Sequence, residues 1–198
     1  MPPQTYTGLR PARLAKILDF MEIHFYPMAE CGYWYNSGAI KLANLAYLES
    51  VLYETALAGL PTVIGEFGWY GGGRVPMGSK QLSPPATQQQ QAHFLAQVIC
   101  TSTPLACGWL NWVMYDDPVA SDVTRCSGLF TAEGKLKDWG KRFGQISLDY
   151  RRNLPPVPLG RIGPRPELPW DACLTSSAAE EKFRLEYLEA FKREHFRT

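Results

Sequence analysis

The stretch "LPTVIGEFG", residues 60 to 68, places a carboxylate directly after an apolar strand pattern. Val63 and Ile64 are typical of a buried strand, and Glu66 follows them where that strand should end. A charged group in this position must be desolvated, paired or functional. The glycines at 71 to 73 then interrupt regular structure and let the backbone bend closely around this point.

Strand-like and helix-like segments alternate through the first part of the chain. Strands are predicted at 18–27, 60–67 and 106–117, and helices at 41–59, 84–102 and 134–152. Such alternation favours parallel strands joined by right-handed crossovers, and therefore an α/β fold. Functional groups gather at the carboxyl ends of the strands in these folds, which is where we expect Glu66.

The C-terminal residues differ in composition. Residues 153–174 are rich in Pro and Gly, which predicts a linker or a surface strap. Residues 175–198 predict an amphipathic helix, with Ser177 and Glu180 in the spacing of a capping box. We therefore expect three parts, 1–152, 153–174 and 175–198, with the last helix packed against the first part.

Composition excludes several classes of protein. The 198 residues are 45% hydrophobic and 13% aromatic, which is enough for a substantial core. A net charge of +1 provides no basic field, so we expect no nucleic-acid partner. No apolar window is long enough for a membrane span, and the first residues lack the apolar core of a secretory signal, so the chain as written should stay in the cytosol. Five cysteines without zinc-type spacing indicate free thiols and no metal.

The three predicted strand ends have side chains suited to chemistry. On the first, two-residue alternation places Glu22, His24 and Tyr26 on one face. The second ends in Glu66, and the third contains Trp112. A hydrogen-bonded pair in the core is the alternative for His24 and Tyr26, and simple packing is the alternative for Trp112.

With these motifs the sequence resembles the C-terminal part of a cellulase-type (β/α)8-barrel glycoside hydrolase, family 5 of clan A. "DFMEIHFYP" is similar to the sixth-strand pattern of that family, "LPTVIGEFG" to the seventh and "GWLNWVMYDDP" to the eighth. The resemblance covers roughly residues 12 to 145. It implies a TIM-barrel-type fold of which only the last three β/α units, strands 6 to 8, are present, followed by a Pro-rich extension with a helix.

The resemblance also implies an activity. It is retaining hydrolysis of β-glycosidic bonds in a β-glucan, a β-mannan or a related glycoside, without cofactor or metal. Glu66 would be the nucleophile, His24 and Tyr26 would orient it or hold the sugar, and Trp112 would stack beneath the sugar. The chemistry agrees, because retaining glycosidases use one carboxylate as nucleophile and a second carboxyl about 5 to 5.5 Å away as acid/base.

Aromatic residues in the expected loops are further candidates for contact with a carbohydrate substrate. Aromatic faces suit the C–H surface of a sugar ring. Loop aromatics also simply cover a core, so this alternative stays open. The candidates are Trp34, Tyr35, Trp69 and Tyr70.

The chain differs from the resembled family in one essential motif. It has no "NEP"-type motif, which holds the general acid/base of that family. Glu22 is the nearest substitute, but it lies one alternation deeper and should point into a packed interior. We therefore expect a truncated gene model, a fragment, or one part of a longer polypeptide of a type that is often secreted.

An incomplete barrel has physical consequences. Three strands taken from a barrel leave open edges, so we expect self-association unless the N-terminal half-barrel is supplied. The alternative function is a catalytically silent chain that binds carbohydrate.

Overall fold

Three short strands form a single parallel sheet. The computed structural model describes residues 10–27, 35, 38–77, 81–152 and 162–195. Its strands are β1 (Met21–Phe25), β2 (Thr62–Phe67) and β3 (Gly108–Asn111), hydrogen-bonded in the order β1-β2-β3. Both pairs are parallel, which confirms the predicted α/β fold with a parallel sheet.

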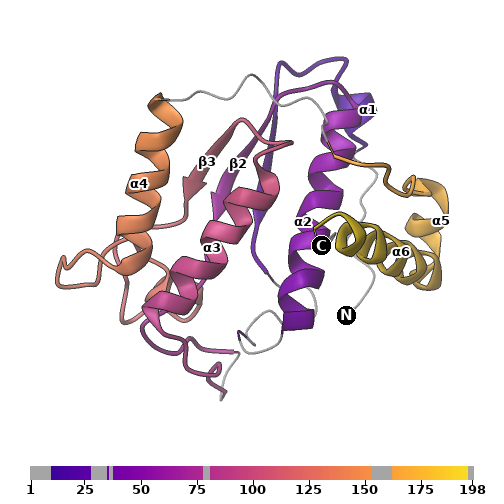
Figure 1. Ribbon diagram of the computed structural model, residues 1–198. Coiled ribbons are helices and arrows are strands. Elements are labelled where there is room, and N and C mark those ends of the chain that lie inside the picture. Colours follow the sequence, from indigo (N-terminus) through magenta and orange to yellow (C-terminus); the bar gives the residue numbers. More distant parts are fainter. Residues whose placement is uncertain (1–9, 28–34, 36–37, 78–80, 153–161, 196–198) are drawn as a thin grey trace.

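A long helix follows each strand, and these three helices cover one face of the sheet (Figure 1). They are α2 (Gly38–Leu57), α3 (Gln88–Ser102) and α4 (Asp138–Arg152). The described residues also form the short helices α1 (Pro11–Leu14), η1 (Val123–Cys126) and α5 (Trp170–Thr175), which the sequence patterns did not predict. The last helix, α6 (Ser177–His195), lies where an amphipathic helix was expected.

The hydrophobic core lies between the sheet and the helices. Ile64 and Phe67 of β2 are fully buried, and the ring of Phe67 packs edge-on against Trp139 and Phe143 of α4. The other helices contribute Leu48 and Leu52 from α2 and Phe94, Leu95 and Val98 from α3. Because aromatic side chains bury the largest apolar areas, β2 and α4 anchor this core.

The opposite face of the sheet is open in the described part of the chain. The side chains of Glu22 and His24 are 53% and 51% exposed there. Leu110 of β3 is also exposed, on the same side of the sheet. Among the described strands, β1 and β3 each have a neighbour on one side only. The expected self-association therefore stays a prediction, with a physical basis in these two edges.

The third strand is shorter than the sequence pattern predicts. Residues 106–117 favour one long strand, but β3 ends at Asn111. Val113 has a φ of 61°, a left-handed conformation that is costly for a β-branched residue and incompatible with a strand. The chain therefore leaves the sheet directly after Trp112.

Helix α3 begins with a complete capping box. The Thr87 hydroxyl accepts a hydrogen bond from the Gln90 amide at 3.0 Å, and the Gln90 side chain accepts one from the Thr87 amide at 2.8 Å. The prolines at 84 and 85, expected in the first helical turn, therefore lie before the helix, which starts at Gln88.

This capping box gives a test of local stability. Thr87→Ala should lower the free energy of unfolding by about 1 kcal/mol, because the Gln90 amide loses the hydroxyl that accepts its hydrogen bond. Urea denaturation followed by circular dichroism would measure the change. Gln89→Ala is the matched control in the same turn, since Gln89 is exposed, and an equal loss in both variants would contradict the capping role.

The C-terminal helix packs on the side of α2 that faces away from α3 (Figure 1). Its buried face consists of Phe183, Tyr187, Ala190 and Phe191. The capping box expected at Ser177 is wrong, because the residue that caps the helix is Ser176. Ser176 keeps an extended backbone and its hydroxyl accepts from the Ala179 amide at 3.3 Å, whereas Ser177 is already helical.

A buried ion pair holds this C-terminal region on α2. Arg165 Nε donates to Glu49 Oε1 at 2.7 Å, and the two side chains are 2% and 1% exposed. The Tyr187 hydroxyl donates to the same oxygen at 3.2 Å, and His195 Nε2 lies 3.3 Å from Glu49 Oε2. Arg165 also pairs with Glu194 at 2.5 Å. A buried carboxylate requires such a set of partners, because its desolvation is otherwise very costly.

Candidate functional site

A β-bulge in β2 determines where Glu66 points. Ile23 pairs with Ile64, but the next residue of β1, His24, pairs with Glu66, so β2 has one extra residue. The pairing of β2 with β3 shifts in the same interval, between Ile64 and Phe67. Strict alternation would place Ile64 and Glu66 together on the helix-covered face. The bulge instead leaves Phe67 buried there and brings Glu66 beside His24.

Two side chains, one in β1 and one directly after it, lie close to the same oxygen of Glu66. The Tyr26 hydroxyl donates to Glu66 Oε2 at 3.0 Å, and His24 Nδ1 lies 3.2 Å from the same atom. The Glu66 side chain is 27% exposed, so it is partly shielded and still accessible. Burial, the hydrogen bond to Glu66 and the negative charges of Glu66 and Asp122 raise the pKa of Tyr26. Tyr26 therefore remains a hydrogen-bond donor throughout the ordinary pH range.

Glu22 extends this group on β1. Its Oε1 lies 3.3 Å from His24 Nε2, and the predicted shared face of Glu22, His24 and Tyr26 is confirmed. Glu22 was expected to point into a packed barrel interior, and this stays a prediction because it concerns strands beyond the three described. Its side chain is 53% exposed, because the described residues place no further strand over this face.

Trp112 lies directly after β3, next to the strand that ends in Glu66. Its amide donates to the Phe67 carbonyl at 2.8 Å, and its side chain keeps 37% of its surface exposed. The indole nitrogen donates to the Thr124 hydroxyl at 3.2 Å, which fixes the ring partly open to solvent.

Asn111 braces the backbone that presents Trp112. Its side-chain nitrogen donates to the carbonyls of Trp112 and Val113, both at 2.9 Å. Its side-chain oxygen accepts from the Trp139 indole at 2.7 Å. These bonds compensate for the left-handed backbone at Val113, a kind of strain that concentrates at functional sites.

The loop after β3 adds residues that sequence reasoning missed. Asp122 acts on Tyr26 through its charge, and Thr124 binds Trp112. The Asp122 carboxylate also accepts from the Thr124 amide at 2.8 Å, which starts η1. An Asp two residues before Thr in a polar loop was the available signal, because this spacing is typical of an Asx turn.

Three of the four loop aromatics lie in the core. Trp69 is fully buried, and Tyr35 is 5% exposed with its hydroxyl donating to the Tyr70 carbonyl at 2.8 Å. Their rings pack against Tyr70, which is also fully buried. Side chains without exposed surface have no face for a sugar in this structure. Trp34 lies outside the described residues.

Asp116, which follows the third strand, forms an ion pair with a buried lysine. Lys137 is fully buried and its Nζ lies 2.8 and 2.9 Å from the two Asp116 oxygens. The Gly128 amide donates to Asp116 Oδ1 at 2.8 Å, and Lys137 also donates to the Cys126 carbonyl. Burial raises the pKa of Asp116, while the hydrogen bond and charge of Lys137 oppose that rise. This pair joins the loop after β3 to the start of α4.

Comparison with solved structures identifies similar folds. A GH5_18 protein from Streptomyces cattleya in complex with Manβ1-4GlcNAc matches 91% of this chain and 45% of that chain, with a TM-score of 0.58 and 21% identity. A GH5_18 protein from Bifidobacterium longum subsp. longum, also with Manβ1-4GlcNAc, matches 73% of this chain and 33% of that chain, with a TM-score of 0.53 and 22% identity. In its fold, the chain is similar to these GH5_18 glycoside hydrolases.

The similarity covers only part of these structures. The chain spans 33% of one of these structures and 45% of the other. No known protein-family profile matches the sequence, and no curated protein does. The chain therefore has an α/β fold with a parallel sheet. The solved structures that it resembles are TIM-barrel glycoside hydrolases.

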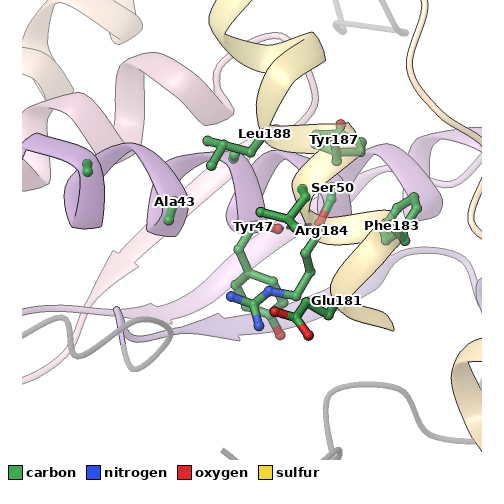
Figure 2. A pocket seen from close by; sticks show the side chains of 11 residues that line it. Ala43, Tyr47, Ser50, Glu181, Phe183, Arg184, Tyr187 and Leu188 are labelled. Carbon is green, nitrogen blue, oxygen red and sulfur yellow. Dashed lines mark hydrogen bonds between the residues drawn. The ribbon is translucent and has the colours of Figure 1, made fainter. Parts of the chain in front are cut away.

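A separate pocket lies between α2 and α6, and none of the site residues lines it. Its volume is about 260 Å³, and its walls include Ala43 and Leu188. Figure 2 shows the side chains of Tyr47, Arg184 and Glu181 together at one end of it.

In the described part of the chain, no helix is both long and apolar enough to cross a membrane.

Proposed function

We propose that this chain is the C-terminal part of a retaining β-glycosidase whose nucleophile is Glu66. The observation that supports this most is the convergence of the Tyr26 hydroxyl and His24 Nδ1 on one oxygen of Glu66 at the end of β2. In this proposal β1, β2 and β3 are strands 6 to 8 of a TIM barrel, and the site lies at their carboxyl ends.

The contacts of Glu66 indicate which oxygen reacts. Among the described residues, its polar contacts fall on Oε2, so Oε1 is available to attack the anomeric carbon. Attack forms a covalent glycosyl-enzyme, which water then hydrolyses. Tyr26 keeps its proton because its pKa is raised, so its hydroxyl donates to Oε2 and holds the carboxylate in position.

The proposed acid/base belongs to strands beyond the three described. A retaining mechanism needs a second carboxyl about 5 to 5.5 Å from the nucleophile to protonate the leaving oxygen. The sequence has no "NEP"-type motif to supply it. Aryl glycosides with activated leaving groups need little protonation, so the half-site can be tested with them.

The proposed substrate is a β-glucan, a β-mannan or a related glycoside. Trp112 would stack beneath the sugar, since its indole is partly exposed and held at the end of β3. The similar GH5_18 proteins are in complex with Manβ1-4GlcNAc, so an aryl β-mannoside is the first probe to choose.

The test is release of a chromophore from a panel of aryl β-glycosides by this chain and by Glu66→Ala. Release, or a covalent burst detected by mass spectrometry, that depends on Glu66 would support the proposal. No reaction from a demonstrably folded chain would contradict it for this chain.

The alternative is a catalytically silent chain that binds carbohydrate, favoured by the absent acid/base motif. Calorimetry with cello- and manno-oligosaccharides would then give heat that depends on Trp112. We expect Trp112→Ala to weaken binding by roughly tenfold to a hundredfold, because a stacked ring contributes about 1 to 3 kcal/mol. Trp170→Ala is the control for loss of an indole away from the sheet, and heat that is unchanged in Trp112→Ala would exclude the stacking role.

A further inference from the structure

We infer that Glu22 is a positioning residue that holds the His24 ring against Glu66. The Glu22 carboxylate lies 3.3 Å from His24 Nε2, and His24 Nδ1 lies 3.2 Å from Glu66 Oε2. One imidazole therefore lies between two carboxylates that come from different strands. The catalytic meaning of this arrangement rests on the proposed function, whereas the arrangement itself does not.

The exposure of His24 explains why such a residue is needed. Its side chain is 51% exposed, and no described helix packs over this face of the sheet. A half-exposed imidazole rotates about its terminal torsion, which is broad. A second contact, at the other ring nitrogen Nε2, fixes that rotation. Glu22 provides this contact within the same strand, two residues before His24.

Gly65 gives Glu22 its place. A Cβ built on Gly65 would lie 1.8 Å from Glu22 Oε1 and 2.4 Å from the Glu22 carboxyl carbon. The Glu22 side chain thus crosses from β1 over the backbone of β2 at the bulge. Glycine at position 65 therefore leaves room for the Glu22 side chain. The same residue lies at the bulge that turns Glu66 toward His24.

The chemistry couples the three groups. A close contact between a ring nitrogen and a carboxylate oxygen is attractive when a hydrogen lies between them. Glu22 and Glu66 thus both contact one imidazole, Glu22 at Nε2 and Glu66 at Nδ1. A change at Glu22 is then transmitted to the oxygen of Glu66 that also binds Tyr26.

The test is the set of side-chain ¹⁵N shifts of the histidines, measured by NMR on this chain at one neutral pH. The sequence has three histidines, and exposed His93 on α3 is an internal reference for an unrestrained ring. We expect the ring shifts of His24 to differ from those of His93 in the parent chain. In Glu22→Ala this difference should be lost, and in Glu22→Gln it should be kept, because an amide still bonds Nε2.

Gly65→Ala provides an independent test that removes no charge. It should reproduce the effect of Glu22→Ala, because the added methyl occupies the place of the Glu22 carboxylate. Glu186→Ala is the control, as it removes an exposed carboxylate from α6. Unchanged His24 shifts in Glu22→Ala would overturn the inference, and so would parent shifts already equal to those of His93. If Gly65→Ala fails to fold, Glu22→Ala and Glu22→Gln still decide.

Activity separates this inference from the proposed function. If the chain releases chromophore, Glu22→Ala should lower kcat by roughly tenfold to a hundredfold with KM nearly unchanged, and Glu22→Gln should restore most of it. If no variant releases chromophore but the histidine shifts follow the expected pattern, the proposed function fails and the positioning role stands. If release depends on Glu66 but not on Glu22, the positioning role fails alone.

Discussion

Glu66→Gln is expected to reduce chromophore release from aryl β-glycosides at least about a thousandfold, because an amide forms no glycosyl-enzyme. The substitution keeps the shape of the side chain, so the hydrogen bond from Tyr26 and the bulge in β2 should persist. The measurement is steady-state release together with intact-protein mass spectrometry for the covalent intermediate.

Two controls make the Glu66 result specific. Glu189→Gln removes an exposed carboxylate on α6 that is paired with Lys192, and it should leave release unchanged. Adding azide to Glu66→Ala should restore release, because a small external nucleophile enters the space of the lost carboxylate and attacks the activated glycoside. Equal release by the parent chain and Glu66→Gln would remove Glu66 from the proposed role.

Lys137→Met is expected to lower the free energy of unfolding by about 3 to 5 kcal/mol. Lys137 is fully buried and the Asp116 side chain is 15% exposed, so the substitution leaves a largely buried carboxylate without its cation. Chemical denaturation followed by tryptophan fluorescence would measure the loss.

The matched control for this ion pair is Lys141→Met on the same helix. Lys141 is 63% exposed and pairs with Asp138 at 3.4 Å, so its loss should cost less than about 0.5 kcal/mol. The double variant Asp116→Leu, Lys137→Met should recover part of the stability, since no unpaired charge remains. Equal effects of the two lysine variants would contradict the buried-pair interpretation.

The alternation of strands and helices was predictable because each element has a simple hydrophobic period. Two-residue alternation placed Glu22, His24 and Tyr26 on one face, and the structure confirms it. The position of Glu66 was predicted to be a strand end, but its direction depends on the bulge beside Gly65. A bulge changes the pairing of neighbouring strands, so one strand read alone does not reveal it.

Other features depended on contacts between distant residues. Trp69 and Tyr35 lie in loops, where aromatic residues favoured a sugar-binding interpretation, but both are buried by packing against Tyr70. The structural role of Asp116 depends on Lys137, which is 21 positions away in the sequence. The capping box at Thr87 was visible in the sequence as Thr-x-x-Gln and was overlooked in favour of the prolines before it.

The ion pair between Glu49 and Arg165 has a consequence for the order of folding. These residues are 116 positions apart, and the Tyr187 and His195 partners of Glu49 come later still. During synthesis, Glu49 of α2 therefore lacks these partners until the residues from Arg165 to His195 have been made. Long-range contacts of this kind form slowly because their loops must close first. We expect α6 to dock after α2 has formed, and the surface of α2 that α6 covers to be open to chaperones until then.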